Sequence, residues 1–126
     1  MARVITPADA KRLGLPGRVS LEIVSGKHNG ASLTCRLVEI PVVKPGEARR
    51  NPHRHLGFEE CMYVLSGEGI TWSASGEYPV KAGDTILVPA DEPHVTRNTG
   101  SVPLMMLCFF PVPDIVPGTK DATFPD

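Results

Sequence analysis

The stretch NPHRHLGFEE, residues 51–60, places two histidines one residue apart and two glutamates shortly after them, beside a proline and a glycine. On a β-strand alternate side chains point to the same face, so His53 and His55 would lie together with Cα atoms about 6.6 Å apart. Glu60 begins the next β-like run and can join them. His94 is distant in sequence, but an antiparallel barrel brings distant strands side by side. Strand parity therefore predicts that His53 and His55 lie together, and a barrel could add Glu60 and His94 to make a group of three imidazoles and one carboxylate.

Such a group of side chains is a candidate metal site. Three neutral imidazoles and a carboxylate suit Fe, Mn, Ni, Co, Cu or Zn better than Ca or Mg. The predicted cofactor is a divalent transition metal, held by His53, His55, Glu60 and His94. An octahedral ion would keep two positions for water, a bidentate substrate or O₂. Glu60 is also the candidate catalytic residue, because a ligating carboxylate can move to take up a proton.

The remaining sequence is typical of one all-β domain. A chain of 126 residues suits one core, and its thirteen prolines and twelve glycines indicate short elements joined by turns. β-Branched and apolar runs recur along the chain, and regular spacing of this kind favours a sandwich or barrel. The runs are residues 18–26, 31–42, 59–69, 70–80, 84–90, 93–100 and 103–112.

Three segments depart from the strand pattern. TPADAKRLG, residues 6–14, predicts a short N-terminal helix, because Thr6 can cap it and Pro7 suits its first position. GKHNG, residues 26–30, predicts a hairpin turn or a loop between two strands. The tail, about 111–126, carries four prolines and predicts an extended surface segment.

Charge and composition exclude several partners. The formal net charge is -1, and the basic residues are scattered apart from Arg49 and Arg50, so nucleic acid is not an expected partner. We find no secretory signal and no run long enough to span a bilayer, which predicts a cytoplasmic protein without a membrane partner. Cys35, Cys61 and Cys108 are odd in number and include no close pair, so we expect free thiols.

Two stretches resemble the motifs of the cupin superfamily. Residues 46–67 resemble the first motif, with a glycine, His-x-His, a glutamate and a further glycine. Residues 83–98 resemble the second, with a glycine, a proline, a histidine and an asparagine. Gly46 stands one residue farther from His53 than is usual. Asp91 replaces a common glycine, and aspartate tolerates left-handed turns.

The resemblance implies a single cupin domain over residues 1–126, of the small microbial type. It implies a cupin-type jelly-roll β-barrel with inward-facing motif residues, assembled as a homodimer. The motif places six residues between the glutamate and Gly67, which selects Glu60 as the ligand and leaves Glu59 facing outward. A small-molecule substrate is the expected partner.

Strand parity names candidate substrate-binding residues. Counting from Glu60, His94 and His53 directs Met62, Thr96, Asn98 and Arg49 toward the interior. Arg36 could bind a substrate carboxylate or could lie on the surface. Met106 and Phe110 could line an apolar pocket, although an ordinary strand core explains them equally well. The candidate set is Arg36, Arg49, Met62, Thr96, Asn98, Met106 and Phe110.

The cupin resemblance does not by itself fix a reaction, because that family includes dioxygenases, decarboxylases, isomerases, epimerases, lyases and sugar-binding proteins. Our leading hypothesis is a metal-dependent enzyme that acts on a small oxygen-rich organic substrate as an O₂-dependent dioxygenase. An apolar strand near the site, which would limit water, favours it. One alternative is a non-oxidative isomerase, lyase or decarboxylase of a sugar or keto acid. Another is a non-catalytic cupin that binds a sugar or a small acid.

Overall fold

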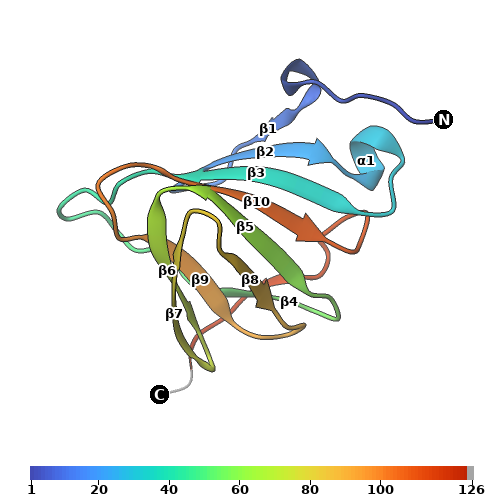
Figure 1. Cartoon of the computed structure of the whole chain (residues 1–126). Helices are drawn as coiled ribbons and strands as arrows, with labels where there is room; N and C mark the ends of the chain where they lie inside the picture. Colours follow the sequence, from blue (N-terminus) through green and yellow to red (C-terminus); the bar gives the residue numbers. More distant parts are fainter. Residues whose placement is uncertain (125–126) are drawn as a thin grey trace.

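The computed structural model describes residues 1–124, which form two antiparallel β-sheets (Figure 1). One sheet has the order β1-β2-β3-β10-β5-β8 and the other the order β11-β4-β9-β6-β7. The predicted all-β fold is confirmed. The elements are a 3₁₀ helix Pro7–Asp9, β1 Lys11–Leu13, β2 Val19–Val24, α1 Gly26–Asn29, β3 Thr34–Ile40, β4 His53–His55, β5 Glu60–Ser66, β6 Glu68–Ser73, β7 Gly76–Lys81, β8 Thr85–Val88, β9 His94–Asn98, β10 Leu104–Phe110 and β11 Thr119–Asp121.

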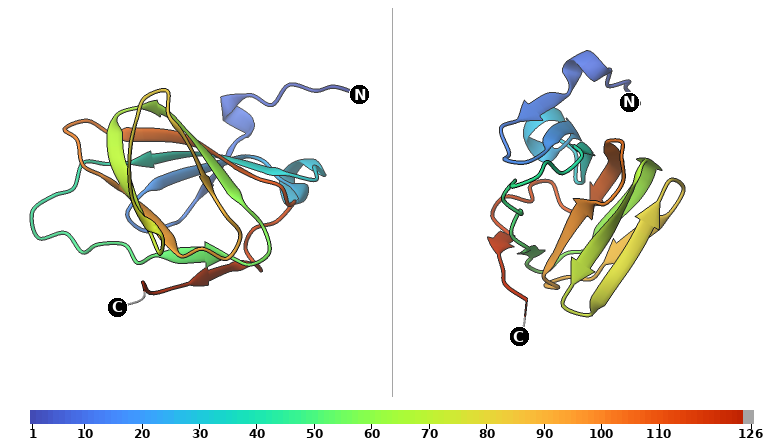
Figure 2. Two further views of the ribbon diagram at one scale, coloured as in Figure 1. Left: turned by 60° about the horizontal axis from the view of Figure 1, so that its bottom comes forward. Right: turned by 90° about the vertical axis from the view of Figure 1, so that its left-hand side faces the viewer.

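The core lies between the two sheets, which face each other in Figure 2. Along β10 the buried residues alternate, with Leu104, Met106, Cys108 and Phe110 turned inward. Val64 of β5 is fully buried and belongs to the same cluster. Burying one such side chain contributes roughly 1.5–3 kcal/mol to stability. The alternation therefore fixes which face of each strand lines the interior.

The predicted N-terminal helix is wrong in length: it is a single 3₁₀ turn, Pro7–Asp9. Asp9 accepts a hydrogen bond of 2.9 Å from the backbone of Thr6, which closes the turn. No residue of the turn is buried, so no packing extends the helix. Residues 11–13 instead form β1 and pair with β2 at the edge of the six-stranded sheet.

Two of the expected strand runs are divided by turns. The run 59–69 ends as β5 at Ser66 and resumes as β6 at Glu68. Gly67 forms the break: its φ is +83°, and a Cβ there would lie 2.5 Å from the carbonyl oxygen of Pro103. The run 70–80 contains most of β6 and β7, which pair as a hairpin. Glycine is required at residue 67 both by its φ and by the close approach.

The segment GKHNG connects two paired antiparallel strands, β2 and β3, as predicted, but it forms a four-residue helix, α1, and not a tight turn. Ser25 caps it, since its hydroxyl accepts a hydrogen bond from the backbone N–H of His28. Gly30 ends it with a φ of +67°. Helix α1 connects the end of β2 to the start of β3 (Figure 1).

The C-terminal segment runs along the five-stranded sheet. Its β11 pairs with β4 and forms the edge of that sheet. Two further backbone hydrogen bonds hold the segment beside β4, from Leu56 N–H to Gly118 and from Ala122 N–H to Pro52. Residues 125–126 of the predicted extended tail lie outside the described residues.

Within residues 1–124, no helix is both long enough and apolar enough to cross a bilayer.

Candidate metal centre

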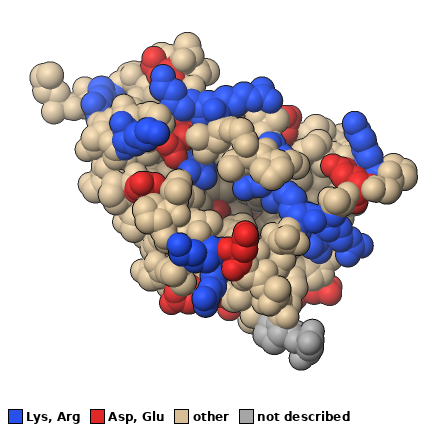
Figure 3. All heavy atoms as spheres, turned by 180° about the vertical axis from the view of Figure 1, so that it is seen from behind, with Lys and Arg blue, Asp and Glu red and all other residues tan. Residues whose placement is uncertain are grey.

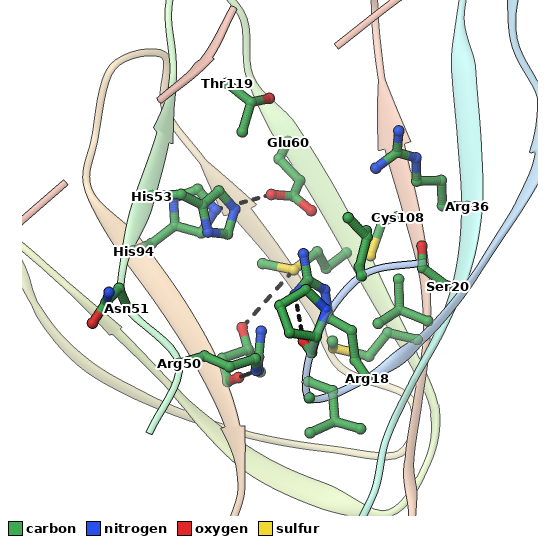
Figure 4. Close-up of a pocket in the computed structure, with 18 of the residues that line it drawn as sticks. Arg18, Ser20, Arg36, Arg50, Asn51, His53, Glu60, His94, Cys108 and Thr119 are labelled. Carbon is green, nitrogen blue, oxygen red and sulfur yellow. Dashed lines mark hydrogen bonds and ion pairs between the residues drawn. The ribbon is translucent and has the colours of Figure 1, made fainter. Parts of the chain in front are cut away.

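The four predicted ligands come from three strands in two sheets. Strand β4 lies between β11 and β9, and His53 of β4 is the register partner of His94 of β9. His55 follows on the same strand, because alternate residues share a face. Glu60 begins β5 in the opposite sheet. The cluster therefore spans the interior from one sheet to the other (Figure 4).

The ligand atoms converge. One nitrogen or oxygen from each of His53, His55, Glu60 and His94 lies within 4.8 Å of the others. Oε1 of Glu60 is 3.1 Å from Nε2 of His55 and 2.9 Å from Nε2 of His94. His55, Glu60 and His94 are buried, and His53 is partly buried. This is a cluster able to hold a metal ion.

Hydrogen bonds at Nδ1, on the side of each ring away from Glu60, fix the orientation of the His55 and His94 imidazoles. The hydroxyl of Thr119 donates to the carbonyl of Ile115 at 2.6 Å, so it accepts from Nδ1 of His55 at 2.9 Å. Nδ1 of His94 donates to the carbonyl oxygen of Glu92 at 2.9 Å. Both rings thus carry a proton on Nδ1 and direct Nε2 toward Glu60. Hydrogen bonds of this kind orient histidines that bind metals.

The same arrangement calls for a cation. If both rings are neutral, each Nε2 presents a lone pair to a carboxylate oxygen, which is repulsive. A proton or a metal ion among these atoms removes the repulsion. The donor atoms are nitrogen and oxygen, which matches a transition metal. The residues present therefore fit the predicted cofactor.

The ionisation states of the cluster residues support a bound cation. Burial, and then the neighbouring His94, lower the pKa of His53 to about 3, which leaves this imidazole neutral at neutral pH. Burial raises the pKa of Glu60, but the close side chains of His55 and His94 outweigh burial and hold that pKa well below its usual range. For His94, burial lowers the pKa, but the carboxylate of Glu60 more than offsets burial, so the pKa lies above its usual value. The buried carboxylate stays ionised and attracts positive charge.

The loop before β9 uses Asp91 where the cupin motif commonly has glycine. Asp91 has a φ of +69°, the only positive value at a non-glycine residue in the described chain. Its N–H donates to the carbonyl of His55 at 2.8 Å, and its Oδ1 accepts from the N–H of Gly57 at 3.1 Å. The expected left-handed geometry is present, and the side chain braces the strand that carries His55.

The choice between the two glutamates is clear in the structure. Glu60 is 5% exposed and contacts two imidazoles, whereas Glu59 is exposed to solvent.

A cavity of about 620 Å³ opens beside the cluster. Six of the seven candidate substrate-binding residues line it: Arg36, Arg49, Met62, Thr96, Met106 and Phe110. Asn98 is not among its lining residues within the described chain; its amide donates to the carbonyls of Ile40 and Val102 at 3.0 and 2.8 Å. Arg49 reaches the rim from a loop, because β4 begins only at His53.

The cavity wall includes one hydroxyl group and two charged groups that the sequence did not reveal. Arg18, Ser20 and Arg50 line it. Arg36 donates from Nε and Nη2 to Oε1 of Glu22, at 3.2 and 3.1 Å. The molecular face in Figure 3 is hollowed near its middle, with lysine and arginine side chains on both sides of the hollow. The lining includes four arginines, Arg18, Arg36, Arg49 and Arg50, and three carboxylates, Glu47, Glu60 and Asp121.

Of these three residues, only Ser20 has a signal in the sequence. Ser20 has the same parity as Glu22 on β2, and both are buried polar residues. Parity from His53 selects Arg49 in place of Arg50 only if the strand continues back to residue 49, whereas residues 41–52 form no strand. Arg18 precedes β2 in an aperiodic Leu-Pro-Gly segment, and only the tertiary structure brings it to the cavity.

Comparison with known sequences gives related proteins. A family model described as "Cupin domain" matches residues 40–110. The oxalate-binding protein of Thermotoga maritima is 34% identical over 107 residues, which cover 82% of this chain and 84% of that protein. Protein SchB of Streptomyces halstedii is 36% identical over 72 residues, 57% of this chain and 51% of SchB. An uncharacterized protein of Methanocaldococcus jannaschii is 43% identical over 56 residues, 44% of this chain and 45% of that protein.

Solved structures with the same fold include two enzymes. Oxalate decarboxylase of Lactobacillus farciminis, in a formate complex, matches with a TM-score of 0.76 and 22% identity over 90% of this chain and 34% of that chain. The nucleoside dehydratase Pac13 matches with a TM-score of 0.75 and 18% identity over 100% of this chain and 95% of that chain. At these identities the likeness concerns the fold.

Proposed function

We propose, from the premise that this chain belongs to the cupin family, that it is a metal-dependent protein that binds a small oxygen-rich carboxylate and acts on it. The observation that carries the proposal is the convergence of His53, His55, Glu60 and His94 beside an arginine-lined cavity. The names of the Thermotoga maritima relative and of the Lactobacillus farciminis neighbour, both of which concern oxalate, support a carboxylate ligand.

The three histidines and Glu60 would hold a divalent transition metal. When bound, the metal would supply Lewis acidity and, for a redox-active ion, electron-transfer chemistry. Thr119 and the carbonyl of Glu92 keep two imidazoles in the ligating orientation. Arg50, partly buried in the cavity wall, would neutralise the substrate carboxylate.

Glu60 is better suited to holding the cation than to taking a proton. Its lowered pKa makes the carboxylate a strong electrostatic partner and a weak base. A catalytic role as base would require Glu60 to move away from His55 and His94.

The dioxygenase hypothesis remains a second candidate. Met62, Met106 and Phe110 line the cavity, and an apolar wall limits water near an oxygen-reactive centre. Arginines line the same cavity, so we give precedence to carboxylate binding and non-oxidative chemistry. Oxygen consumption by the Fe(II)-loaded protein with keto acids and hydroxy acids separates the two; measurable uptake with one of them would establish the oxygenase.

Metal and ligand binding test the leading proposal together. We expect calorimetry to detect oxalate binding to Mn(II)- or Ni(II)-loaded protein and none to protein stripped of metal. His94→Ala should lose both metal and oxalate binding, whereas Arg54→Ala, an exposed neighbour of the ligands, should keep them. Oxalate binding that is equally strong without metal would overturn the proposal.

We also propose that the protein forms a homodimer through the outer face of the six-stranded sheet. Tyr63, Leu87 and Phe109 are exposed there, and their strands β5, β8 and β10 are adjacent. An apolar patch on one sheet face is self-complementary about a twofold axis. Sedimentation should find a dimer that Leu87→Glu dissociates. Val4→Glu, at an N-terminal position that is 87% exposed, is the control.

A further inference from the structure

We infer that the cavity contains a second anion-binding subsite at Arg18, and that the natural substrate is a dianion longer than oxalate. One carboxylate would lie at the histidine cluster and the other at Arg18. This inference rests on the proposed carboxylate binding and adds the substrate's second charge.

Within the described residues, the guanidinium of Arg18 forms no direct ion pair with a carboxylate. Its guanidinium donates from Nη1 to the carbonyl of Pro16 at 3.0 Å. Arg36 lines the same cavity but is paired with Glu22 through two hydrogen bonds. Among the described residues, Arg18 therefore joins Arg50 as a cavity arginine whose charge is available to a ligand.

The surroundings of Arg18 favour an anion. Burial lowers the pKa of Arg18 and the nearby charge of Arg36 lowers it further, while the carboxylate of Glu60 partly opposes this decrease. Burial lowers the pKa of Arg50 to about 10, and the charges of Arg18 and Arg97 add to this effect. Cationic groups therefore lie close enough to repel one another. An anion bound between them would relieve the repulsion and replace lost hydration.

A hydroxyl group in the same wall also lacks a partner. Ser20 is 1% exposed and lines the cavity, and its Oγ has no hydrogen-bond partner among the described residues. Buried polar atoms are nearly always hydrogen-bonded, so an unpaired one calls for an explanation. Figure 4 shows Ser20 on the side of the pocket away from His53 and His94. A carboxylate held by Arg18 could accept its hydrogen bond.

The size of the cavity argues for a ligand longer than oxalate. Ser20 lies on β2 of the six-stranded sheet and Arg18 just before β2, whereas His53 and His94 belong to the other sheet. Within the described residues, no hydrogen bond connects Arg18 with the cluster. A cavity of about 620 Å³ leaves room for a ligand larger than oxalate.

Matched ligands test the subsite in the metal-loaded wild-type protein. 2-Oxoglutarate and 2-oxopentanoate have the same chain length and the same keto-acid group, and only the first has a distal carboxylate. We expect calorimetry to give 2-oxoglutarate a Kd at least about 10-fold lower, as charge-assisted hydrogen bonds to a guanidinium imply. Malate against 2-hydroxybutyrate should show the same preference.

Variants locate the preference at Arg18. Arg18→Gln should reduce the 10-fold preference to about 2-fold or less and leave the Kd for 2-oxopentanoate unchanged. Arg12→Gln, an exposed residue of β1, should keep the preference. Ser20→Ala should lower it about 2- to 3-fold, and it provides the same readout if Arg18→Gln does not fold.

The outcomes distinguish the two proposals. If the metal-loaded protein binds oxalate but binds both members of each pair equally, the subsite at Arg18 is wrong and the proposed function stands. If no carboxylate binds to the metal-loaded protein, the proposed function fails. A preference that survives in Arg18→Gln would also overturn the subsite.

Discussion

The two walls of the cavity differ in how completely their polar atoms are paired. On the wall formed by β4 and β9, Nδ1 of His55 and Nδ1 of His94 each have a partner, and their Nε2 atoms both meet Glu60. On the opposite wall, among residues 1–124, Arg18 has no ion-pair partner and Ser20 Oγ has no hydrogen bond. The first wall, the organised wall, has these polar atoms paired before any ligand binds. The second, the unpaired wall, would be completed by a bound ligand.

The largest effect should come from the organised wall. Glu60→Gln removes the only carboxylate of the cluster, and we expect metal affinity to fall by at least about 100-fold, because loss even of supporting contacts costs 10- to 100-fold. Metal titration followed by competition with a chelator measures it. Glu59→Gln, its exposed neighbour, is the matched control. Equal losses in the two variants would contradict our assignment of the ligand.

A smaller effect should follow when the support of one imidazole is removed. Thr119→Val deletes the acceptor for Nδ1 of His55, and metal affinity should fall by about 10-fold or more. Thr119→Ser keeps a hydroxyl and should restore most of it. Thr123→Val, an exposed position in the same segment, should have no effect. Unchanged affinity in Thr119→Val would show that this hydrogen bond does not orient the ring.

The unpaired wall should respond through ligand affinity. Gly17 has a φ of +72°, and a Cβ there would lie 2.9 Å from Cδ of Arg50. Gly30 has a φ of +67° with nothing within 4 Å. Both alanine variants should lose about 1–2 kcal/mol of folding free energy from backbone strain. In Gly17→Ala alone, displacement of Arg50 should weaken carboxylate binding several-fold, as measured by calorimetry.

Equal carboxylate affinities in these two glycine variants would show that the position of Arg50 does not matter to the ligand.

The smallest effect should occur at Asp91, behind the organised wall. Asp91→Gly relieves a left-handed φ of +69° but loses the hydrogen bond to Gly57, so the two changes offset each other within about 0.5 kcal/mol. Asp91→Ala loses the hydrogen bond and keeps the strain, and should be about 1–2 kcal/mol less stable. Urea unfolding of both variants measures the difference. A glycine variant as unstable as the alanine variant would mean that the side chain matters more than the backbone.

The sequence predicted the organised wall well because the information there is local. His53 and His55 share a face by strand parity, and Gly67 identified Glu60. His94 required the cupin resemblance, since spacing alone cannot say which distant strand becomes a neighbour. The N-terminal helix was overestimated because capping residues define the start of a helix but do not supply packing for its length.

The wall with Arg18 and Ser20 could not be predicted, because spacing alone cannot say which distant segments become neighbours. Arg18 and Ser20 lie outside both motifs, and their approach to the cluster depends on how β2 joins the sheet through β3. Parity selected Asn98, which is buried but bonds to backbone carbonyls instead of lining the cavity. Burial can be estimated from alternation, whereas the identity of a side chain's partner depends on the tertiary structure.

The contact between Thr119 and His55 has a consequence for the order of events during synthesis. Strand β11 follows all four ligand residues in the chain, so a ribosome makes the ligands before it makes the residue that orients one of them. A nascent chain that already displays both motifs still lacks this hydrogen bond and the edge strand beside β4. The orientation of His55 is therefore completed only after Thr119 has left the ribosome exit tunnel.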